Sequence, residues 1–426
     1  MVKKLRFDAA VVGAGPAGAT AAYKLAKKGF KVLLVERGRV PGSKNVYGGR
    51  VYLAPIKDVY PDFEKEAPVH RWIRKERISL VSGEKMLTIE YRDKDLLSFT
   101  SYLPQLTGWM AGKAEEAGAV LVSEITVDSL LVEDSYVKGI RCGSDEIRVD
   151  VVIDAEGLNR LLLERAGLVS KPSSEYLALG VKETVKLSEE AVNDRFELDS
   201  DEGLAWLFLG DLTQGINGGG FLYTNRDSVN LGLVMILDKG AKKLKEPIHV
   251  LAEKMRLNPL FKRYLRDGKV VEYSAHLTCE APLNLMPPKL YGKGLLIVGD
   301  AAGFSLNLGY TVRGVDLAVY SGALAAEAVE KAHGSGETAE NLSIYERMVK
   351  ESFIYRLIGR FKGVKSLMAQ DRIFTDYPLL ATDIASLIFN IGYDVPTLYE
   401  ALNKARKDRV GLPTLLLDGL KMVRTI

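Results

Sequence analysis

The strongest chemical signal in the sequence is a glycine turn near the N-terminus, Gly13-Ala14-Gly15-Pro16-Ala17-Gly18. It lies between a short apolar run, 7–12, and a helical pattern that reaches Lys28, which is the context of a strand–turn–helix unit. There the first glycine permits the turn, the second lets the backbone approach a pyrophosphate, and the third lets the helix pack closely. We expect a dinucleotide to bind at Gly13, Gly15, Pro16, Ala17 and Gly18; a glycine-rich turn that binds nothing is the alternative.

An acidic residue stands where the ribose of such a dinucleotide would lie. A second apolar run, 31–35, ends at Glu36, and Arg37 follows. A carboxylate at this point can accept hydrogen bonds from ribose hydroxyls and would repel a 2′-phosphate. We expect Glu36 and Arg37 to contact the cofactor.

A second motif, Gly299-Asp300, favours FAD over NAD. A buried strand, 295–298, ends here and a helix opens, so that one carboxylate can lie beside the ribityl chain of an FAD while helix N–H groups face its phosphates. A dehydrogenase that uses only NAD has no need of this element. FAD is therefore the expected cofactor, and an ordinary helix N-cap is the alternative role of Asp300.

Two loops are expected beside the flavin ring. The residues expected to contact it are Lys44, Asn45, Gly48 and Gly49 in the first loop and Gly309, Tyr310, Thr311 and Val312 in the second. Backbone amides there can hydrogen-bond the edge of the ring and stabilise its reduced, anionic form. Arg313 could add positive charge, or it could form a structural ion pair with Asp316.

The composition excludes several other kinds of site. Two cysteines far apart, Cys142 and Cys279, exclude a disulfide framework and are too few for an iron–sulfur cluster, which normally needs four thiolates. The four histidines are not spaced as metal ligands, so no metal site is expected. A net charge of +3, from 58 basic and 55 acidic residues, gives no reason to expect a nucleic-acid partner. No catalytic nucleophile–base set is expected, because a redox cofactor carries the chemistry.

The elements that must position these loops are those of an α/β protein. We expect a Rossmann-type FAD-binding domain with an inserted, mostly antiparallel β-sheet domain and a helical C-terminal region. The expected boundaries are 1–75, 100–170 and 276–335 for the discontinuous FAD-binding domain, 76–99 and 171–275 for the sheet domain that binds the substrate, and 336–426 for the helical region. Residues 38–60 are expected to form a loop, 109–117 a helix, and 314–331 the helix that follows Asp300.

Longer stretches resemble one group of flavoproteins. The two glycine motifs and Val152-Ile153-Asp154-Ala155-Glu156-Gly157 resemble the hydroxylase and geranylgeranyl-reductase group. The segments 41–49, 307–316 and 374–378 look like the electron-transfer-flavoprotein:quinone oxidoreductase family in its FixC-type branch. This resemblance covers nearly the whole chain, and it implies that Ala155 and Gly157 also contact FAD.

The resemblance implies an FAD-dependent oxidoreductase that takes electrons from the alpha and beta subunits of an electron transfer flavoprotein and passes them to a membrane quinone, with menaquinone expected. Larger members carry a cysteine-ligated [4Fe-4S] domain, and the two cysteines here agree instead with a branch that works with a small, separate ferredoxin-like protein. Some such assemblies bifurcate electrons, which is expected here too. A geranylgeranyl-type reductase of isoprenoid double bonds, an FAD-dependent monooxygenase and a subunit whose flavin only relays electrons remain alternatives.

One segment departs from the pattern of related flavoproteins. They often carry an arginine and then an acidic residue before the helix at 109–117, whereas 103–108 here is Leu-Pro-Gln-Leu-Thr-Gly. Gln105 could substitute as a hydrogen-bonding group near the flavin.

The sequence also bears on location. No uncharged apolar stretch is long enough to span a bilayer, so we expect a cytoplasmic protein, peripheral on the cytoplasmic face of the cell membrane. Two segments could meet the quinone: 353–368, which is basic and amphipathic, and 378–393. Packing of these helices on the core or on a partner subunit is the alternative.

Overall fold

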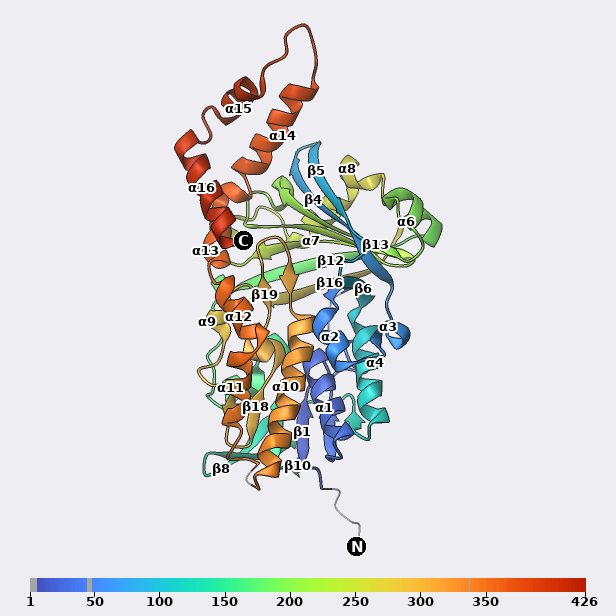
Figure 1. The fold of residues 1–426 in the computed structure, drawn as a ribbon, viewed down its shortest axis with the longest axis vertical. Helices are drawn as coiled ribbons and strands as arrows, with labels where there is room; N and C mark the ends of the chain where they lie inside the picture. The colour runs from blue at the N-terminus through green and yellow to red at the C-terminus, as the bar shows by residue number, and fades with distance from the viewer. Residues whose placement is uncertain (1–5, 44–47, 337) are drawn as a thin grey trace.

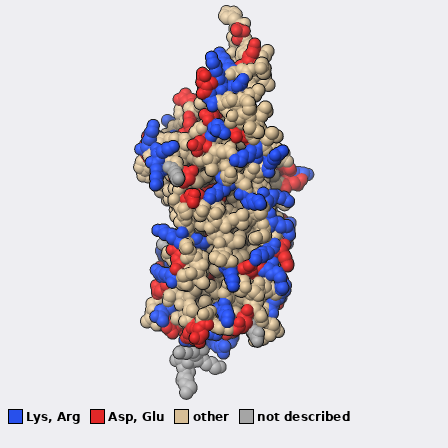
Figure 2. All heavy atoms as spheres, turned by 90° about the vertical axis from the view of Figure 1, so that its left-hand side faces the viewer, with Lys and Arg blue, Asp and Glu red and all other residues tan. Residues whose placement is uncertain are grey.

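A computed structural model describes residues 6–43, 48–336 and 338–426. Two sheets lie one above the other along the long axis, and helices pack beside each of them (Figure 1). The C-terminal helices run along one side of both sheets and end in a projection beyond the upper one (Figures 1 and 2).

The lower sheet is a Rossmann-type unit of six strands. Their spatial order is β17 (Tyr291–Gly292), β18 (Leu295–Ile297), β11 (Val151–Asp154), β1 (Ala9–Val12), β2 (Val32–Val35) and β7 (Val120–Val122). All neighbouring pairs are parallel except β17–β18. Every residue of β1 is buried, which explains why an apolar run without alternation forms this central strand.

Closely packed helices and a small sheet complete the lower half. Helix α1 (Pro16–Lys27) contacts both α10 (Val315–Gly334) and α4 (Leu103–Glu116). A Cβ on Gly322 of α10 would lie 2.1 Å from the carbonyl oxygen of Ala17, so only glycine allows this approach of the two helices. A three-stranded antiparallel sheet of β8 (Ser129–Glu133), β9 (Tyr136–Cys142) and β10 (Asp145–Arg148) packs against β11.

The upper sheet has nine strands. They are β16 (Lys269–Cys279), β12 (Leu177–Lys186), β15 (Ser228–Ile236), β14 (Gly218–Thr224), β13 (Glu202–Gly210), β4 (Arg71–Ser82), β6 (Ser98–Tyr102) and β3 (Gly48–Tyr52) in spatial order, with β5 (Lys85–Arg92) paired to β4. All pairs are antiparallel except β13–β4. The sheet extends beyond 76–99 and 171–275, the segments expected to form the sheet domain, because β3 and β6 also belong to it.

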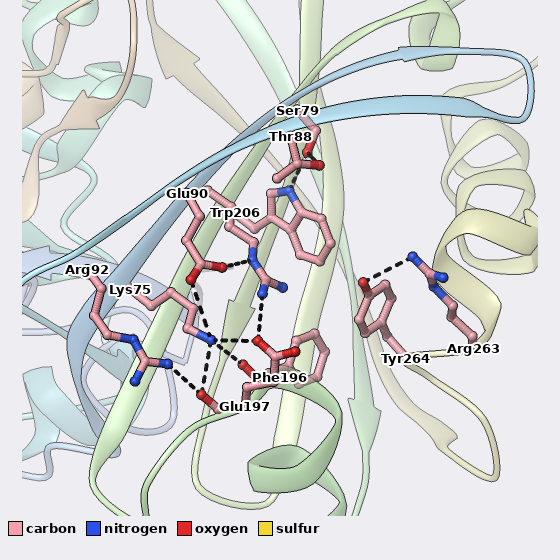
Figure 3. A network of polar contacts seen from close by, with 11 residues as sticks. Lys75, Ser79, Thr88, Glu90, Arg92, Phe196, Glu197, Trp206, Arg263 and Tyr264 are labelled. Carbon is pink, nitrogen blue, oxygen red and sulfur yellow. Dashed lines mark hydrogen bonds and ion pairs between the residues drawn. The ribbon is translucent and has the colours of Figure 1, made fainter. Parts of the chain in front are cut away.

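Helices α6 (Glu189–Phe196), α7 (Ile248–Leu257) and α8 (Pro259–Lys262) cover one face of the upper sheet, where they share a hydrophobic core with it. Charged side chains fix the end of α6 to β4 and β5 (Figure 3). The buried ammonium of Lys75 donates hydrogen bonds to the carbonyl oxygens of Phe196 (2.8 Å) and Glu197 (3.0 Å). A cation here complements the negative end of the helix dipole. Arg77 pairs with Glu90 and with the side chain of Glu197.

The chain after α10 is helical, as expected. It forms α11 (Ser343–Glu351), α12 (Phe353–Arg360), α13 (Val364–Met368), α14 (Asp376–Phe389), α15 (Leu398–Arg406) and α16 (Leu412–Thr425). The segment 353–368 is therefore two helices, not one interfacial helix. Ile354 and Ile358 of α12 are buried in the main core, so its apolar face packs on the protein.

Two further sequence predictions were wrong. Residues 38–60 are not all loop, because they contain β3 and α2 (Ala54–Val59). Helix α4 begins at Leu103 instead of Trp109, since Pro104 suits the first turn of a helix, where no N–H is needed.

The remaining elements are short. They are α3 (Phe63–Glu66), α5 (Leu161–Arg165), α9 (Pro282–Leu285), the strands β19 (Leu306–Asn307) and β20 (Val312–Arg313), and 3-10 helices at Gly157–Asn159, Ser174–Tyr176, Asp211–Thr213, Lys239–Lys243, Gly299–Ala302 and Asp371–Ile373.

Candidate cofactor-binding and active site

The glycine turn joins β1 to α1, and each of its three glycines has a different role. Gly13 has a φ of +98°, and a Cβ there would lie 2.5 Å from the carbonyl oxygen of Ala155. A Cβ on Gly18 would lie 1.9 Å from the carbonyl oxygen of Gly13, so this glycine lets the helix touch the turn. Gly15 has a φ of −71°, which suits any residue, and none of the described atoms lies within 4 Å of a Cβ built on it. It therefore leaves open space directly before α1.

The start of α1 is suited to a phosphate. Within the described chain no side chain caps this helix, and its first turn carries no acidic residue. The first N–H groups of a helix have no partner inside it. Together with the open space at Gly15, these donors form an anion site at the positive end of the helix dipole.

Glu36 is held rigidly at the end of β2. Its Oε2 accepts a hydrogen bond from the N–H of Ala14 (2.9 Å), and its Oε1 accepts one from the N–H of Gly38 (2.6 Å). A carboxylate has about four lone-pair sites, so capacity remains for two ribose hydroxyls. The Arg37 side chain is exposed beside it.

The second motif packs directly on the first. Gly299 has a φ of +61°, and a Cβ there would lie 2.9 Å from the Cβ of Ala17 in α1. A 3-10 helix, Gly299–Ala302, begins here, and its N-cap is Val298. Asp300 therefore lies inside this helix and is not its N-cap. Its carboxylate accepts no hydrogen bond from the described residues, and burial raises the pKa of this group. Asp300 is thus a half-buried residue whose carboxylate has His276 as a nearby charge but no hydrogen bond from the described residues.

These elements enclose a cavity of about 410 Å³ that is lined from both sheets. The sequence-predicted residues that line it are Gly13, Gly15, Pro16, Ala17, Glu36, Arg37, Gly49, Ala155, Gly157, Gly299, Asp300 and Val312. Gly18 is instead packed between helix and turn, and Gly48 begins β3. Lys44 and Asn45 lie outside the described residues. The fold thus brings six separate segments of the chain to one cavity.

The second predicted loop is the tip of the β19–β20 hairpin. The Oδ1 atom of Asn307 accepts the N–H of Gly309 (2.7 Å), and a Cβ on Gly309 would lie 2.9 Å from the Ile426 side chain. Thr311 hydrogen-bonds the Tyr52 hydroxyl (2.7 Å). Of the four residues predicted in this loop, Val312 lines the cavity, and Gly309, Tyr310 and Thr311 do not.

Arg313 is engaged in the ion pair that the sequence left as one of two possibilities. Its Nε donates to Oδ2 of Asp316 (2.9 Å), and the two residues line the cavity together. The Tyr52 ring lies between two guanidinium groups, 4.6 Å from that of Arg50 and 5.1 Å from that of Arg313. Burial is the main cause that raises the pKa of Tyr52, so its hydroxyl is protonated at neutral pH.

Sequence reasoning missed the wall that the upper sheet contributes. It includes Tyr52, Lys182, Phe221, Tyr223 and His276. Alternation within 218–224 could have placed both aromatic residues on one face of a strand, but only the fold shows which face meets the cavity. Gln105, proposed as a flavin contact, is exposed and hydrogen-bonds Nε2 of His70 (2.7 Å), so it is not a residue of this cavity.

The residues present fit an FAD. Val127 is buried and lines the cavity, and neither its N–H nor its carbonyl is paired within the described chain. An adenine edge offers a matching donor and acceptor, Glu36 can take the ribose, and the start of α1 can take the pyrophosphate. Bound here, FAD supplies one- and two-electron redox chemistry.

The buried carboxyl group of Glu280, beside the β19–β20 hairpin, predicts that the stability of the fold depends on pH. Oε2 of Glu280 accepts a hydrogen bond from Nδ2 of Asn307 (2.8 Å), and burial raises the pKa of Glu280 to about 7 from 4.5. The folded chain therefore binds more protons than the unfolded chain between these values, so stability is lost as the pH rises through about 7. Relative to Glu280→Gln, the wild-type free energy of unfolding should fall by about 2–3 kcal/mol between pH 5 and pH 8.

Chemical denaturation of both proteins at the two pH values measures this difference. Asp154, Asp300 and Asp316 also have raised pKa values because they are buried, and they contribute equally to both proteins. Parallel changes in the two proteins would contradict the assignment to Glu280.

Comparisons with known proteins show the family to which this chain belongs. Residues 11–55 match the family described as NAD(P)-binding Rossmann-like domain. The chain is 39% identical over 422 residues to the probable electron transfer flavoprotein-quinone oxidoreductase YdiS of Escherichia coli K12, with 98% of each chain covered. It is 37% identical over 425 residues to Protein FixC of Escherichia coli O157:H7, with 99% of each covered.

Solved structures share the fold. A geranylgeranyl bacteriochlorophyll reductase-like protein from Thermoplasma acidophilum has a TM-score of 0.72 and 20% identity, over 97% of this chain and 99% of that one. The protein CtdE, solved in complex with FAD, has a TM-score of 0.60 and 17% identity, over 83% and 92%. These matches confirm the α/β class with its Rossmann-type unit.

The family follows from the full-length relatives, and the cavity has the parts that their cofactor needs. Since the two Escherichia coli proteins match from end to end, the chain is an FAD-dependent oxidoreductase with a role in electron transfer. It belongs to the electron-transfer-flavoprotein:quinone oxidoreductase family, in the FixC-type branch.

Proposed function

We propose that the protein accepts electrons from the alpha and beta subunits of an electron transfer flavoprotein and passes them through FAD to a membrane quinone, with menaquinone as the first candidate. The observation that carries this proposal is the full-length similarity to a relative described as an electron transfer flavoprotein-quinone oxidoreductase. The cavity supports it, because the aromatic side chains of Tyr52, Phe221 and Tyr223 form a wall suited to a planar, apolar ring.

The proposed cofactor contacts follow the cavity from one end to the other. Glu36 binds the ribose, the turn 13–18 with the start of α1 binds the pyrophosphate, and Asp300 lies beside the ribityl chain. Gly49, Ala155, Gly157 and Val312 are assigned to the cavity near the flavin. Gly309, Tyr310 and Thr311 stay predictions, since they do not line the cavity.

We include a separate ferredoxin-like iron–sulfur protein and electron bifurcation in the proposal. The chain has two cysteines, of which Cys279 is buried and Cys142 is half-buried, so it cannot provide four thiolates for a cluster. A second protein must then carry the low-potential electron in a bifurcating complex. Copurification of the four kinds of subunit would support this composition.

The projecting arm formed by α14 and α15 is the proposed contact with the cytoplasmic face of the membrane (Figure 1). Phe389 at the end of α14 and Ile391 in the loop after it are 78% and 75% exposed. Lysine and arginine side chains lie among acidic ones over this side of the molecule and on the arm, and the basic ones can meet anionic lipid headgroups (Figure 2). Within the described ranges, no helix has the length and apolar character needed to cross a membrane.

The experiment uses the full-length protein with FAD bound. Its flavin is photoreduced without oxygen and then mixed with a soluble menaquinone analogue or with menaquinone in anionic phospholipid vesicles. We expect the quinone to reoxidise the flavin in both cases, with the protein bound to the vesicles in the second. A flavin that stays reduced would refute quinone activity, and saturation of an isoprenoid by the reduced protein would identify a geranylgeranyl-type reductase instead.

A further inference from the structure

Lys182 is a buried cation whose two polar partners, Thr184 and Glu272, both lie at long distances. It lies on β12 with its side chain 5% exposed and lines the cavity. Its Nζ is 3.4 Å from Oγ1 of Thr184 and 3.5 Å from Oε1 of Glu272. Lys75, the other buried lysine described above, has carbonyl oxygens at 2.8 and 3.0 Å. The ammonium of Lys182 therefore keeps donor capacity for an oxygen atom in the cavity.

Glu272 connects this ammonium with solvent. It lies on β16, at the edge of the upper sheet, and its side chain is 47% exposed. Thr184 is hydrogen-bonded on to Oδ1 of Asn230 (2.8 Å), so its hydroxyl proton is already engaged. Solvent, Glu272, Lys182 and the cavity thus form a continuous series of polar groups.

Of the other charged groups that line the cavity, two arginines are held in ion pairs, whereas Asp300 accepts no hydrogen bond from the described residues. Arg50 pairs with Glu76, and Arg313 pairs with Asp316. His276 lines the same wall, on the strand that carries Glu272. The Tyr102 ring, on β6, lies 5.6 Å from the Lys182 ammonium, and its hydroxyl bonds Ser228 (2.6 Å).

We propose that Lys182 is a catalytic residue that donates a proton to a quinone oxygen in the cavity, and that Glu272 relays protons to Lys182 from solvent. This inference rests on the proposed quinone reductase activity. Reduction of a quinone to a quinol takes two electrons and two protons. The electron pair and one proton come from the reduced cofactor, and the second proton comes from Lys182.

The transfer from Lys182 breaks one N–H bond and forms an O–H bond on the quinone. The neutral amine then takes a proton from water through the Glu272 carboxylate, which restores the starting state. Burial lowers the pKa of Lys182, which makes its ammonium a better acid than an exposed one. General acid catalysis of this kind contributes about 100-fold or more to a rate.

Four variants of the full-length, FAD-loaded protein test the proposal, one of them Glu272→Gln in the proposed relay. Lys182→Met removes both the charge and the proton, whereas Lys182→Arg keeps the charge on a group that does not give up a proton near neutral pH. Lys186→Met is the matched control, because Lys186 is on the same strand but is exposed and paired with Asp227. The flavin absorption spectrum and the thermal melting curve establish that each variant is folded and loaded.

The readouts are the rate of flavin reoxidation by a menaquinone analogue across pH, and binding of the unreduced analogue to the oxidised protein. We expect Lys182→Met and Lys182→Arg to slow reoxidation by about 100-fold. Lys182→Arg should still bind the analogue as wild type does. Lys186→Met should match wild type in both the reoxidation rate and the binding of the analogue. Glu272→Gln should lower the reoxidation rate chiefly at high pH, where protons are scarce.

The outcomes separate the two proposals. If wild type does not reduce the quinone, the proposed function fails. If wild type reduces it and folded Lys182→Met does so at the same rate and with the same pH profile, the proton-donor role is refuted. If Lys182→Arg keeps the full rate, the residue supplies charge alone, and the proposal is equally overturned.

Discussion

A Gly15→Val variant should fold like wild type and purify without flavin. The φ of −71° at this position suits valine, and the described atoms leave the space around a Cβ empty for 4 Å, so the protein itself accepts the side chain. The valine would, however, occupy the space in front of α1 that a pyrophosphate needs. We expect the affinity for FAD to fall by ~100-fold or more, which corresponds to about 3 kcal/mol.

The flavin absorbance per protein and the thermal melting curve of the apoprotein measure this result. Gly112→Ala in α4 is the control, since a Cβ there also meets none of the described atoms, and Gly112 is not among the residues that line the cavity. Gly18→Ala should differ from both, because its Cβ would lie 1.9 Å from the Gly13 carbonyl oxygen and must disturb the fold. A yellow Gly15→Val protein would show that the phosphate does not approach at this turn.

Arg71→Met should lower the free energy of unfolding by about 3–5 kcal/mol, the largest stability loss that we expect from a side chain outside the cavity. The Arg71 side chain is completely buried at the start of β4. Its guanidinium donates to the carbonyl oxygens of Asn225 (2.7 Å), Asp199 (3.2 Å), Glu202 (2.8 Å) and Arg226 (2.9 Å). Methionine fills part of the volume but donates no hydrogen bond, so the carbonyls of Asn225, Glu202 and Arg226 lose this donor, whereas that of Asp199 keeps the N–H of Glu202 (3.1 Å).

Urea denaturation of the FAD-loaded proteins measures the loss. Arg74→Met, on the same strand, is the control. Arg74 donates to one carbonyl, that of Leu96 (2.9 Å), so its substitution should lower the free energy of unfolding by about 1 kcal/mol. Burial lowers the pKa of Arg71, yet a guanidinium stays protonated in proteins, so the difference should be nearly constant across neutral pH. Equal losses for both variants would contradict the role assigned to the buried guanidinium.

The sequence by itself determined the dinucleotide unit and the family. The turn 13–18 can be recognised because a phosphate site made of backbone atoms requires glycine at fixed spacings, whatever the rest of the chain does. Glu36 and Gly299-Asp300 are equally local signals, each tied to the end of a buried strand. The first and second motifs were expected to lie together, because the carboxyl ends of parallel strands share one edge of the sheet. The structure shows this proximity, since a Cβ on Gly299 would contact Ala17.

The tertiary structure decided which residues of the upper sheet line the cavity. Lys182, Phe221 and Tyr223 look like ordinary residues of alternating strands, and no local rule tells which face of the nine-stranded sheet meets the cavity. The structure also placed Gln105 at the surface and paired Arg313 with Asp316. Short motifs report backbone geometry, which is local, whereas a cavity wall depends on how two sheets from distant segments are packed together.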